Sequence, residues 1–167
     1  LADRLSARFR VKLDDSENTP GWKFSEYEMK GVPLRVELGP RDIAEGKCVL
    51  VSRVDRSKTI VSLDGVEDAV AEKLAAIRDE LYEKALANRQ AHTYDCTSLD
   101  EIKQKLGENG DGFVRAMWCG DPECEDKVKE LTEVGSRCIP FDQEQLSDKC
   151  VCCGRPAKKL VYWGKAY

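Results

Sequence analysis

Six of the eight cysteines fall between positions 119 and 153, and this crowding constrains the fold more than any other feature of the sequence. Cys119 and Cys124 form a C-x4-C pair, and Cys150 and Cys153 form a C-x2-C pair. Intracellular cysteine pairs at such spacings typically hold zinc, whereas a secreted disulfide scaffold is shorter and spreads its cysteines along the whole chain. The spacing therefore predicts one Zn²⁺ bound by these four thiolates.

Tetrahedral coordination by four sulfurs leaves no position for water or substrate, so this zinc is expected to be structural. Cys152 is an alternative fourth ligand, because C-x-C spacing is also sterically possible, but the glycine after Cys153 favours Cys153. Cys138 is a further spare. Two other interpretations stay open: a redox-active C-x-x-C pair, and buried thiols that bind no metal. Cys48, in the run KCVLV, is predicted to be a small core residue.

The composition is that of a globular protein, with 41% hydrophobic and 35% charged residues in 167, enough for one large domain or two small ones. No stretch approaches the about 20 apolar residues that cross a bilayer, and the first residues contain no secretory signal. The net charge of −4 argues against a protein that coats nucleic acid, so any such contact must be local. The chain opens without Met in a helix-like segment, and we expect it to be cut from a longer one.

Hydrophobic periodicity predicts a mixed sheet with helices in the first half. FRVKL at 9–13 alternates like a strand, and Thr19-Pro20 is expected to begin a helix that runs to Gly31. Apolar residues at helical spacing in 66–89 predict an amphipathic helix packed on the sheet. The expected strands are 34–38, 47–54 and 58–63, and the helical stripe is Val70, Leu74, Ile77, Leu81 and Ala85.

The second half is predicted to be a smaller α/β unit, stabilised by the zinc. Ser98 to Glu101 is a capping box that opens a short helix ending at Gly107, and Asp121-Pro122 is expected to begin another helix. The expected strands are 113–119, 137–141 and 160–163. The helical pattern fails between 91 and 96, which places the predicted domains at 1–90 and 91–167.

Residues 21–42, GWKFSEYEMKGVPLRVELGPRD, interleave aromatic, basic and acidic side chains. Unpaired RNA bases are recognised by stacking on aromatic rings and by hydrogen bonds from arginine or carboxylate groups to their edges. The segment therefore suits the reading of bases. A purely structural interpretation, a charged helix followed by an edge strand with Trp22 and Phe24 in the core, fits the same residues equally well.

This segment resembles the signature GxKFxxxExKGVPxRxExGxRD of the anticodon-binding domain of prolyl-tRNA synthetases of the archaeal and eukaryotic-like type. The resemblance implies recognition of the two guanines at the second and third anticodon positions of tRNA(Pro). The residues that it assigns to base contacts are Phe24, Glu28, Arg35, Arg41 and Asp42, with Lys23 as a phosphate contact.

The second half resembles the C-terminal domain of the same family, through C-x4-C, a later cysteine pair before Gly-Arg-Pro-Ala-Lys, and the ending Trp-Gly-Lys-Ala-Tyr. This resemblance implies the zinc site and a C-terminal tail in which Tyr167 reaches the active site of a catalytic domain. That domain, with its ATP, its Mg²⁺ and the expected homodimer contact, lies outside this chain. We therefore expect a cytoplasmic ligase fragment without catalytic residues; His92 is given no role. The alternative is a stand-alone RNA-binding or regulatory zinc protein.

Overall fold

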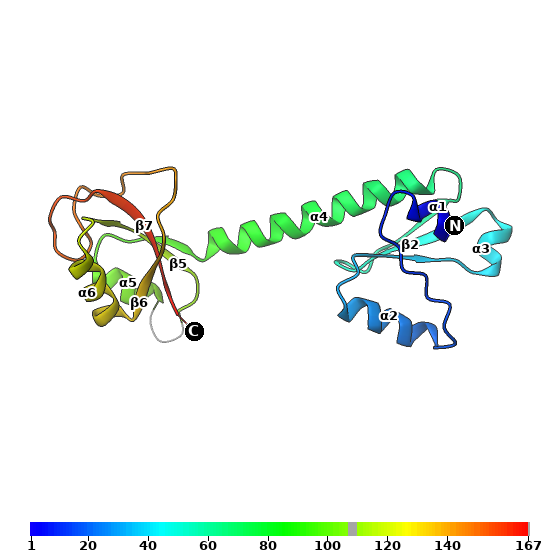
Figure 1. Cartoon of the computed structure of the whole chain (residues 1–167), viewed down its shortest axis with the longest axis horizontal. Coiled ribbons are helices and arrows are strands. Elements are labelled where there is room, and N and C mark those ends of the chain that lie inside the picture. Colours follow the sequence, from blue (N-terminus) through cyan, green and yellow to red (C-terminus); the bar gives the residue numbers. More distant parts are fainter. Residues whose placement is uncertain (107–109, 167) are drawn as a thin grey trace. The chain divides into compact units, whose positions relative to one another are not determined.

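The structure is a computed structural model that describes residues 1–106 and 110–166 (Figure 1). The chain divides into two compact units, Leu1–Lys84 and Ala85–Tyr167, and each combines helices with one β-sheet. The α/β class predicted from the sequence is confirmed. In the described ranges, none of the helices combines the length and the apolar character that crossing a membrane requires.

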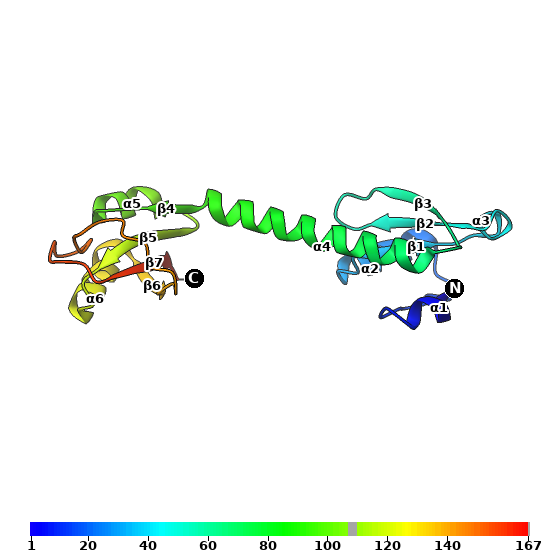
Figure 2. The ribbon, with the colours of Figure 1, turned by 90° about the horizontal axis from the view of Figure 1, so that it is seen from above.

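The first unit is built on a three-stranded sheet in the order β1-β2-β3, and Figure 2 shows the strands side by side. Both pairings are antiparallel, where the sequence interpretation expected a mixed sheet. Parallel pairing needs a crossover of a dozen or more residues, and the connections between these strands are too short for one. The elements are α1 (Ala2–Ser6), α2 (Pro20–Met29), β1 (Leu34–Glu37), α3 (Pro40–Ala44), β2 (Lys47–Ser52), β3 (Lys58–Ser62) and the first part of α4 (Val66–Ala91).

Strand β1 divides the first unit into two faces, because successive side chains of a strand point to opposite sides. Leu34 and Val36 pack into a core with Cys48 and Leu50 of β2 and with α1 and α4. Cys48 is fully buried, which confirms its predicted core role. Arg35 and Glu37 face the other side, where α2 lies (Figure 1). The alternation of side chains in β1 thus places Arg35 and Glu37 on the same side of the sheet as α2, which carries the first part of the sequence motif.

Three helices begin with a proline directly after their N-cap residue. The Thr19 hydroxyl accepts a hydrogen bond from the Trp22 N–H at 3.4 Å, as predicted for α2. Helix α3 was not predicted, although it uses the same device: Pro40 follows Gly39, and the carboxylate of Asp42 accepts from the Gly39 N–H at 2.9 Å. Five residues are too few to show helical periodicity, so only this cap could have indicated α3.

Two further predictions for the first unit are wrong. Residues 9–13 form no strand and take part in none of the strand pairings among the described residues, because alternation of side chains does not by itself supply the backbone hydrogen bonds of a sheet. The stripe of α4 is only partly buried: Ile77 is 3% exposed, but Leu81 is 44% exposed and Ala85 lies at the surface. A helix of 26 residues is about 39 Å long, whereas strands of four to six residues span at most about 20 Å. Helix α4 is therefore longer than the sheet on which its first part packs.

The second unit contains a four-stranded sheet in the order β4-β5-β7-β6, in which only β4 and β5 pair in parallel. Its core joins both helices to the sheet, with Ile102 and Leu106 of α5, Val128 of α6 and the fully buried Trp163. The elements are β4 (Thr93–Asp95), α5 (Leu99–Leu106), β5 (Phe113–Trp118), α6 (Pro122–Thr132), β6 (Val134–Cys138) and β7 (Lys159–Lys165).

Most elements of the second unit were predicted from the sequence, but β4 was not predicted and β6 was predicted at the wrong residues. The predicted strand 137–141 is observed at Val134–Cys138. Pro140 cannot donate a ladder hydrogen bond, and Phe141 is fully exposed, so the apolar run Ile139 to Phe141 is not part of the sheet. The predicted helix stop at Gly107 and the predicted tail residue Tyr167 lie outside the described residues.

The uneven burial of α4 gives a matched pair of variants. We expect Ile77→Ala to lower the free energy of unfolding by about 2 to 5 kcal/mol, because it leaves a cavity in a packed region. Leu81→Ala should lower it by less than about 1 kcal/mol, because much of that side chain already contacts solvent. Urea denaturation of both variants measures the difference; equal losses would contradict the burial described here.

Candidate functional site

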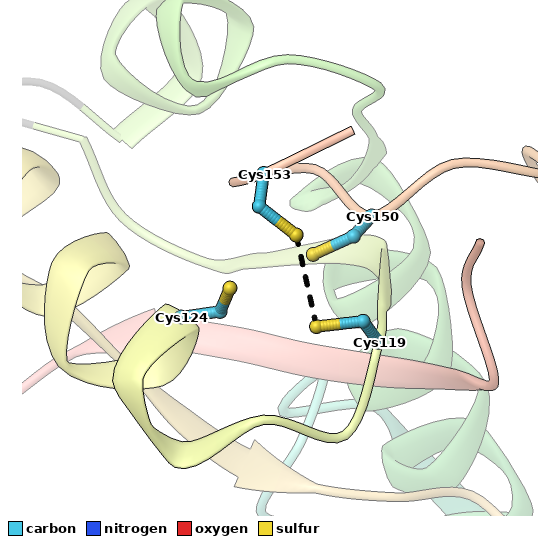
Figure 3. A group of neighbouring side chains, drawn as sticks. All are labelled: Cys119, Cys124, Cys150 and Cys153. Atoms are coloured by element: carbon cyan, nitrogen blue, oxygen red, sulfur yellow. Dashed lines mark hydrogen bonds between the residues drawn. The ribbon is translucent and has the colours of Figure 1, made fainter. Parts of the chain in front are cut away.

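Four cysteine sulfurs converge in the second unit. The Sγ atoms of Cys119, Cys124, Cys150 and Cys153 all lie within 4.8 Å of one another, and Figure 3 shows them pointing toward a common centre. The Sγ atoms of Cys119 and Cys153 are 3.8 Å apart. A tetrahedron with Zn–S bonds of about 2.3 Å has edges of about 3.8 Å, so this spacing suits four thiolates around one ion.

Two tight turns produce the convergence. Cys119 follows β5, and Gly120, with φ of 89°, turns the chain toward Asp121, which caps α6 and sets Cys124 in its first turn. In the other turn, the Gly154 N–H donates to the Cys150 carbonyl at 3.0 Å, and the Cys150 N–H donates to the Arg155 carbonyl at 2.8 Å. Each pair is therefore fixed by local backbone geometry.

The two spare cysteines are not among the four whose sulfurs converge. Cys152 is half-buried and packs beside the cluster, but it is not one of the four residues whose sulfurs converge. Cys138 is exposed at the end of β6. In the described part of the chain, the cysteines form no disulfide with one another. The geometry thus brings together the four residues that the sequence predicted.

The cluster combines buried thiols with one cation. Burial raises the pKa of the Cys124 thiol to about 11 and also raises the pKa of Cys150. The side chain of Arg155 is the main reason why the pKa of Cys153 falls to about 6. Bound metal requires deprotonated thiols, so uptake of an ion by this cluster would release protons. Sequence analysis missed Arg155, because nothing in the cysteine spacing points to it.

The arrangement could hold a metal ion and offers it a closed site. Four sulfur donors in a tetrahedron are the coordination that Zn²⁺ adopts in structural sites, and they leave no position for a reacting molecule. Three of the four cysteines are buried and Cys153 lies at the surface. The donor set therefore fits a structural metal that joins the β5–α6 turn to the turn preceding β7.

A second candidate site is a cleft of about 740 Å³ in the first unit. It lies between α1 and the chain that follows it, α2, β1 and the first part of α4. Four of the six residues predicted to contact RNA line this cleft: Lys23, Phe24, Arg35 and Asp42. Glu28 lies beside it on α2 and Arg41 lies on α3.

Arg35 is the centre of the polar part of the cleft. Its guanidinium carbon lies 3.7 Å from the centroid of the Phe24 ring, a close cation–π contact. The same guanidinium donates to Glu37 at 3.0 Å and to Glu28 at 3.3 Å. These interactions hold an aromatic ring, a cation and two carboxylates in one small area.

The remaining predicted residues differ in whether their side chains already form hydrogen bonds within the protein. The ammonium group of Lys23 donates hydrogen bonds to the carbonyls of Asp14 and Ser16 at 3.1 and 2.6 Å. A phosphate contact would have to replace these bonds. Arg41 is exposed and makes no side-chain hydrogen bond or ion pair within the described residues. Trp22 is 51% exposed, unlike the core residue of the purely structural interpretation.

Two arginines that the sequence motif does not include also reach this area. Arg53 donates to the Glu28 carbonyl at 2.9 Å, and Arg56 lies 3.7 Å from the Glu28 carboxylate while 80% of its side chain is exposed. Both come from the β2–β3 hairpin, about 25 residues after Glu28 in the chain. Only their place in a basic hairpin turn could have indicated them from the sequence.

Comparison with known families agrees with this division of sites. Residues 1–73 match the family described as anticodon binding domain, and residues 99–167 match the family described as prolyl-tRNA synthetase, C-terminal. All 167 residues align with a proline–tRNA ligase of Ruminiclostridium cellulolyticum at 57% identity. The chain belongs to the prolyl-tRNA synthetase family.

Other members of the prolyl-tRNA synthetase family match equally broadly. Proline–tRNA ligases of Clostridium botulinum and Lachnoclostridium phytofermentans are 55% and 54% identical to the chain over all of its residues. In each of these three relatives the match covers 35% of the relative's length. The chain thus spans about a third of the curated prolyl-tRNA synthetases that it matches.

The metal cluster of this prolyl-tRNA synthetase segment gives a test of the fourth ligand. We expect Cys153→Ser to lose most of its bound metal, because its sulfur is one of the four that converge. Cys152→Ser should retain metal, because the Cys152 sulfur lies outside that group. Spectra of the Co²⁺-loaded chain report the number of thiolate ligands; loss of metal in Cys152→Ser alone would reverse the assignment.

Proposed function

We propose that this chain recognises the anticodon of tRNA(Pro) on behalf of a proline–tRNA ligase, whose catalytic part binds ATP and Mg²⁺ and lies outside these 167 residues. The observation that carries this proposal is the gathering of Phe24, Arg35, Glu28 and Asp42 at and beside one cleft. Residues 1–90 would form the anticodon-binding domain and 91–167 the zinc-bearing domain. The setting would be the cytoplasm, with any homodimer contact made by the catalytic part.

The chemistry of guanine supports this assignment. Guanine presents N1–H and N2–H donors on one side of its Watson–Crick edge and the O6 acceptor on the other. Carboxylates such as Glu28 and Asp42 can accept from the donors, and the Arg35 guanidinium can donate to O6. Single-stranded bases are splayed from their neighbours and stack on aromatic rings or guanidinium planes, which Phe24 and Arg35 offer together.

The free cleft is already organised for this task. Arg35 is held by Glu28, Glu37 and the Phe24 ring, and Asp42 is oriented by its bond to the Gly39 N–H. Side chains held in place lose little conformational entropy when a base binds. Arg41, which is exposed beside Asp42, would complete the contacts to the second guanine.

We also propose that the hairpin arginines Arg53 and Arg56 bind the phosphates that join the recognised bases. They add two positive charges beside Glu28 on a chain whose net charge is −4. Phosphate contacts position RNA without reading its sequence. Local basic groups of this kind give an acidic protein one surface that attracts a polyanion.

The four-cysteine cluster would hold one structural Zn²⁺ that stabilises the second domain, with Cys119, Cys124, Cys150 and Cys153 as ligands. Bound zinc would supply folding free energy and no chemistry, since four sulfurs close its coordination sphere. A stand-alone RNA-binding zinc protein remains the rival. Relatives named proline–tRNA ligase that are almost three times longer favour the ligase fragment.

Anticodon recognition predicts a selective loss on truncation of Arg35. Arg35→Ala should weaken binding to a proline tRNA by about 1 to 3 kcal/mol, the scale of one good base contact, and should change binding to an anticodon-substituted tRNA far less. Arg78→Ala, which removes an exposed arginine on α4, is the matched control. Equal losses on both RNAs would refute a base-specific role. Thermal unfolding checks that the loss of the Glu28 and Glu37 partners leaves the fold intact.

The hairpin arginines should behave differently from Arg35. Arg56→Ala should weaken binding to both tRNAs alike and reduce the slope of log K against log salt by about 1, because one phosphate contact releases about one counterion. The titration is repeated at several salt concentrations with Arg78→Ala as control. An unchanged slope would show that Arg56 does not touch RNA.

A further inference from the structure

We propose that Arg155 is a positioning residue of the metal site, which ties the two cysteine pairs together and donates hydrogen bonds to their thiolates. The inference rests on the zinc site proposed above and assigns a role that the four ligands alone do not imply. It is carried by the contacts of one guanidinium group with both turns of the site.

The guanidinium of Arg155 contacts three of the four ligands. Its Nε donates to the Cys153 sulfur at 3.2 Å. Its Nη2 lies 3.7 Å from the Cys124 sulfur and 3.9 Å from the Cys119 sulfur. Cys153 belongs to the second turn and the other two cysteines to the first, so the side chain spans the gap that a metal would otherwise bridge alone.

Asp121 fixes the direction of this side chain. One carboxylate oxygen of Asp121 accepts from Arg155 Nη2, and the other accepts from the Glu123 N–H at 3.0 Å as the cap of α6. The ion pair therefore connects the helix that carries Cys124 to the turn that carries Cys153. An arginine fork can serve a carboxylate and sulfurs at the same time, which the single ammonium of a lysine cannot do in this geometry.

The charge of the site explains why a cation is useful there. Four thiolates around Zn²⁺ leave a net charge of −2, and three of the cysteines are buried. A buried negative charge is costly unless hydrogen-bond donors or an opposite charge compensate for it. Arg155 supplies both at the exposed side of the cluster, where Cys153 meets solvent. Hydrogen bonds to a thiolate also withdraw electron density from the sulfur and make it a weaker nucleophile.

Residues that orient the ligands of a metal typically change metal affinity by about 10- to 100-fold when they are removed. We expect Arg155→Met in the 167-residue chain to weaken Zn²⁺ binding by this factor, measured by competition with a chelator of known affinity. Lys159→Met is the matched control, because it removes an exposed positive charge from β7 of the same unit. Arg155→Lys should fall between the wild type and Arg155→Met.

A second measurement separates positioning from general stability. In the Co²⁺-loaded chain, removal of hydrogen bonds to the thiolates should shift the thiolate-to-metal charge-transfer band to lower energy in Arg155→Met. Asp121→Asn keeps a side chain that can cap α6 but loses the ion pair, so it should show a smaller change in the same direction. Reaction of the zinc-loaded cysteines with a thiol-alkylating reagent should be faster in both variants.

The results separate this inference from the metal proposal. If the wild-type chain binds no Zn²⁺, the metal site itself is wrong and the inference falls with it. If the wild type binds Zn²⁺ and Arg155→Met keeps both the wild-type affinity and the wild-type band, the positioning role is overturned while the metal site stands. If Arg155→Met does not fold, Arg155→Lys decides: wild-type affinity and an unshifted band in that variant would overturn the role.

Discussion

The crowding of four sulfur atoms is the constraint on which the second unit depends. Thiols within 4.8 Å of one another can all be deprotonated only if positive charge lies among them. The turn after β5, the cap of α6 and the turn before β7 are arranged to bring these atoms together. A small sheet with two helices has a limited core, so a metal at this place would join the segment 139–158, which contributes few core residues, to the folded body.

In the first unit the corresponding constraint is the two-residue period of β1. One face of the strand closes the apolar core and the other places Arg35 and Glu37 beside α2. Stability and recognition therefore use alternate residues of the same four-residue strand. A shift of the strand by one residue would bury both charges and expose Leu34 and Val36, so correct pairing with β2 is also what preserves the proposed reading surface.

The sequence allowed prediction of the features that depend on local patterns. Patterns of neighbouring residues were enough to predict the helix starts at Thr19-Pro20 and Asp121-Pro122. They were also enough to predict the strands β1 to β3 and the two cysteine pairs that converge. Two of the errors concern features that depend on distant partners. Alternation at 9–13 found no strand to pair with, and the stripe of α4 continued beyond its sheet.

The candidate sites show the same division between local and distant information. The motif at 21–42 identified residues that line one cleft, because they lie within one short stretch of chain. Arg53, Arg56 and Arg155 escaped prediction, because their relevance comes only from the side chains that folding places beside them. A single arginine forms no repeating pattern in the sequence, so the sequence does not show which side chains it will contact in the folded chain.

The prolines at the first positions of α2, α3 and α6 have a consequence for how the sites assemble. Proline has few backbone conformations in the unfolded chain, and each such residue contributes about 0.4 to 1 kcal/mol to stability by reducing the entropy lost on folding. Lys23 and Phe24 follow Pro20, Arg41 and Asp42 follow Pro40, and Cys124 follows Pro122, each within four residues. A small part of the backbone entropy that these helix starts lose on folding is thus already absent from the unfolded chain, and the rest is still lost when the residues after each proline become ordered.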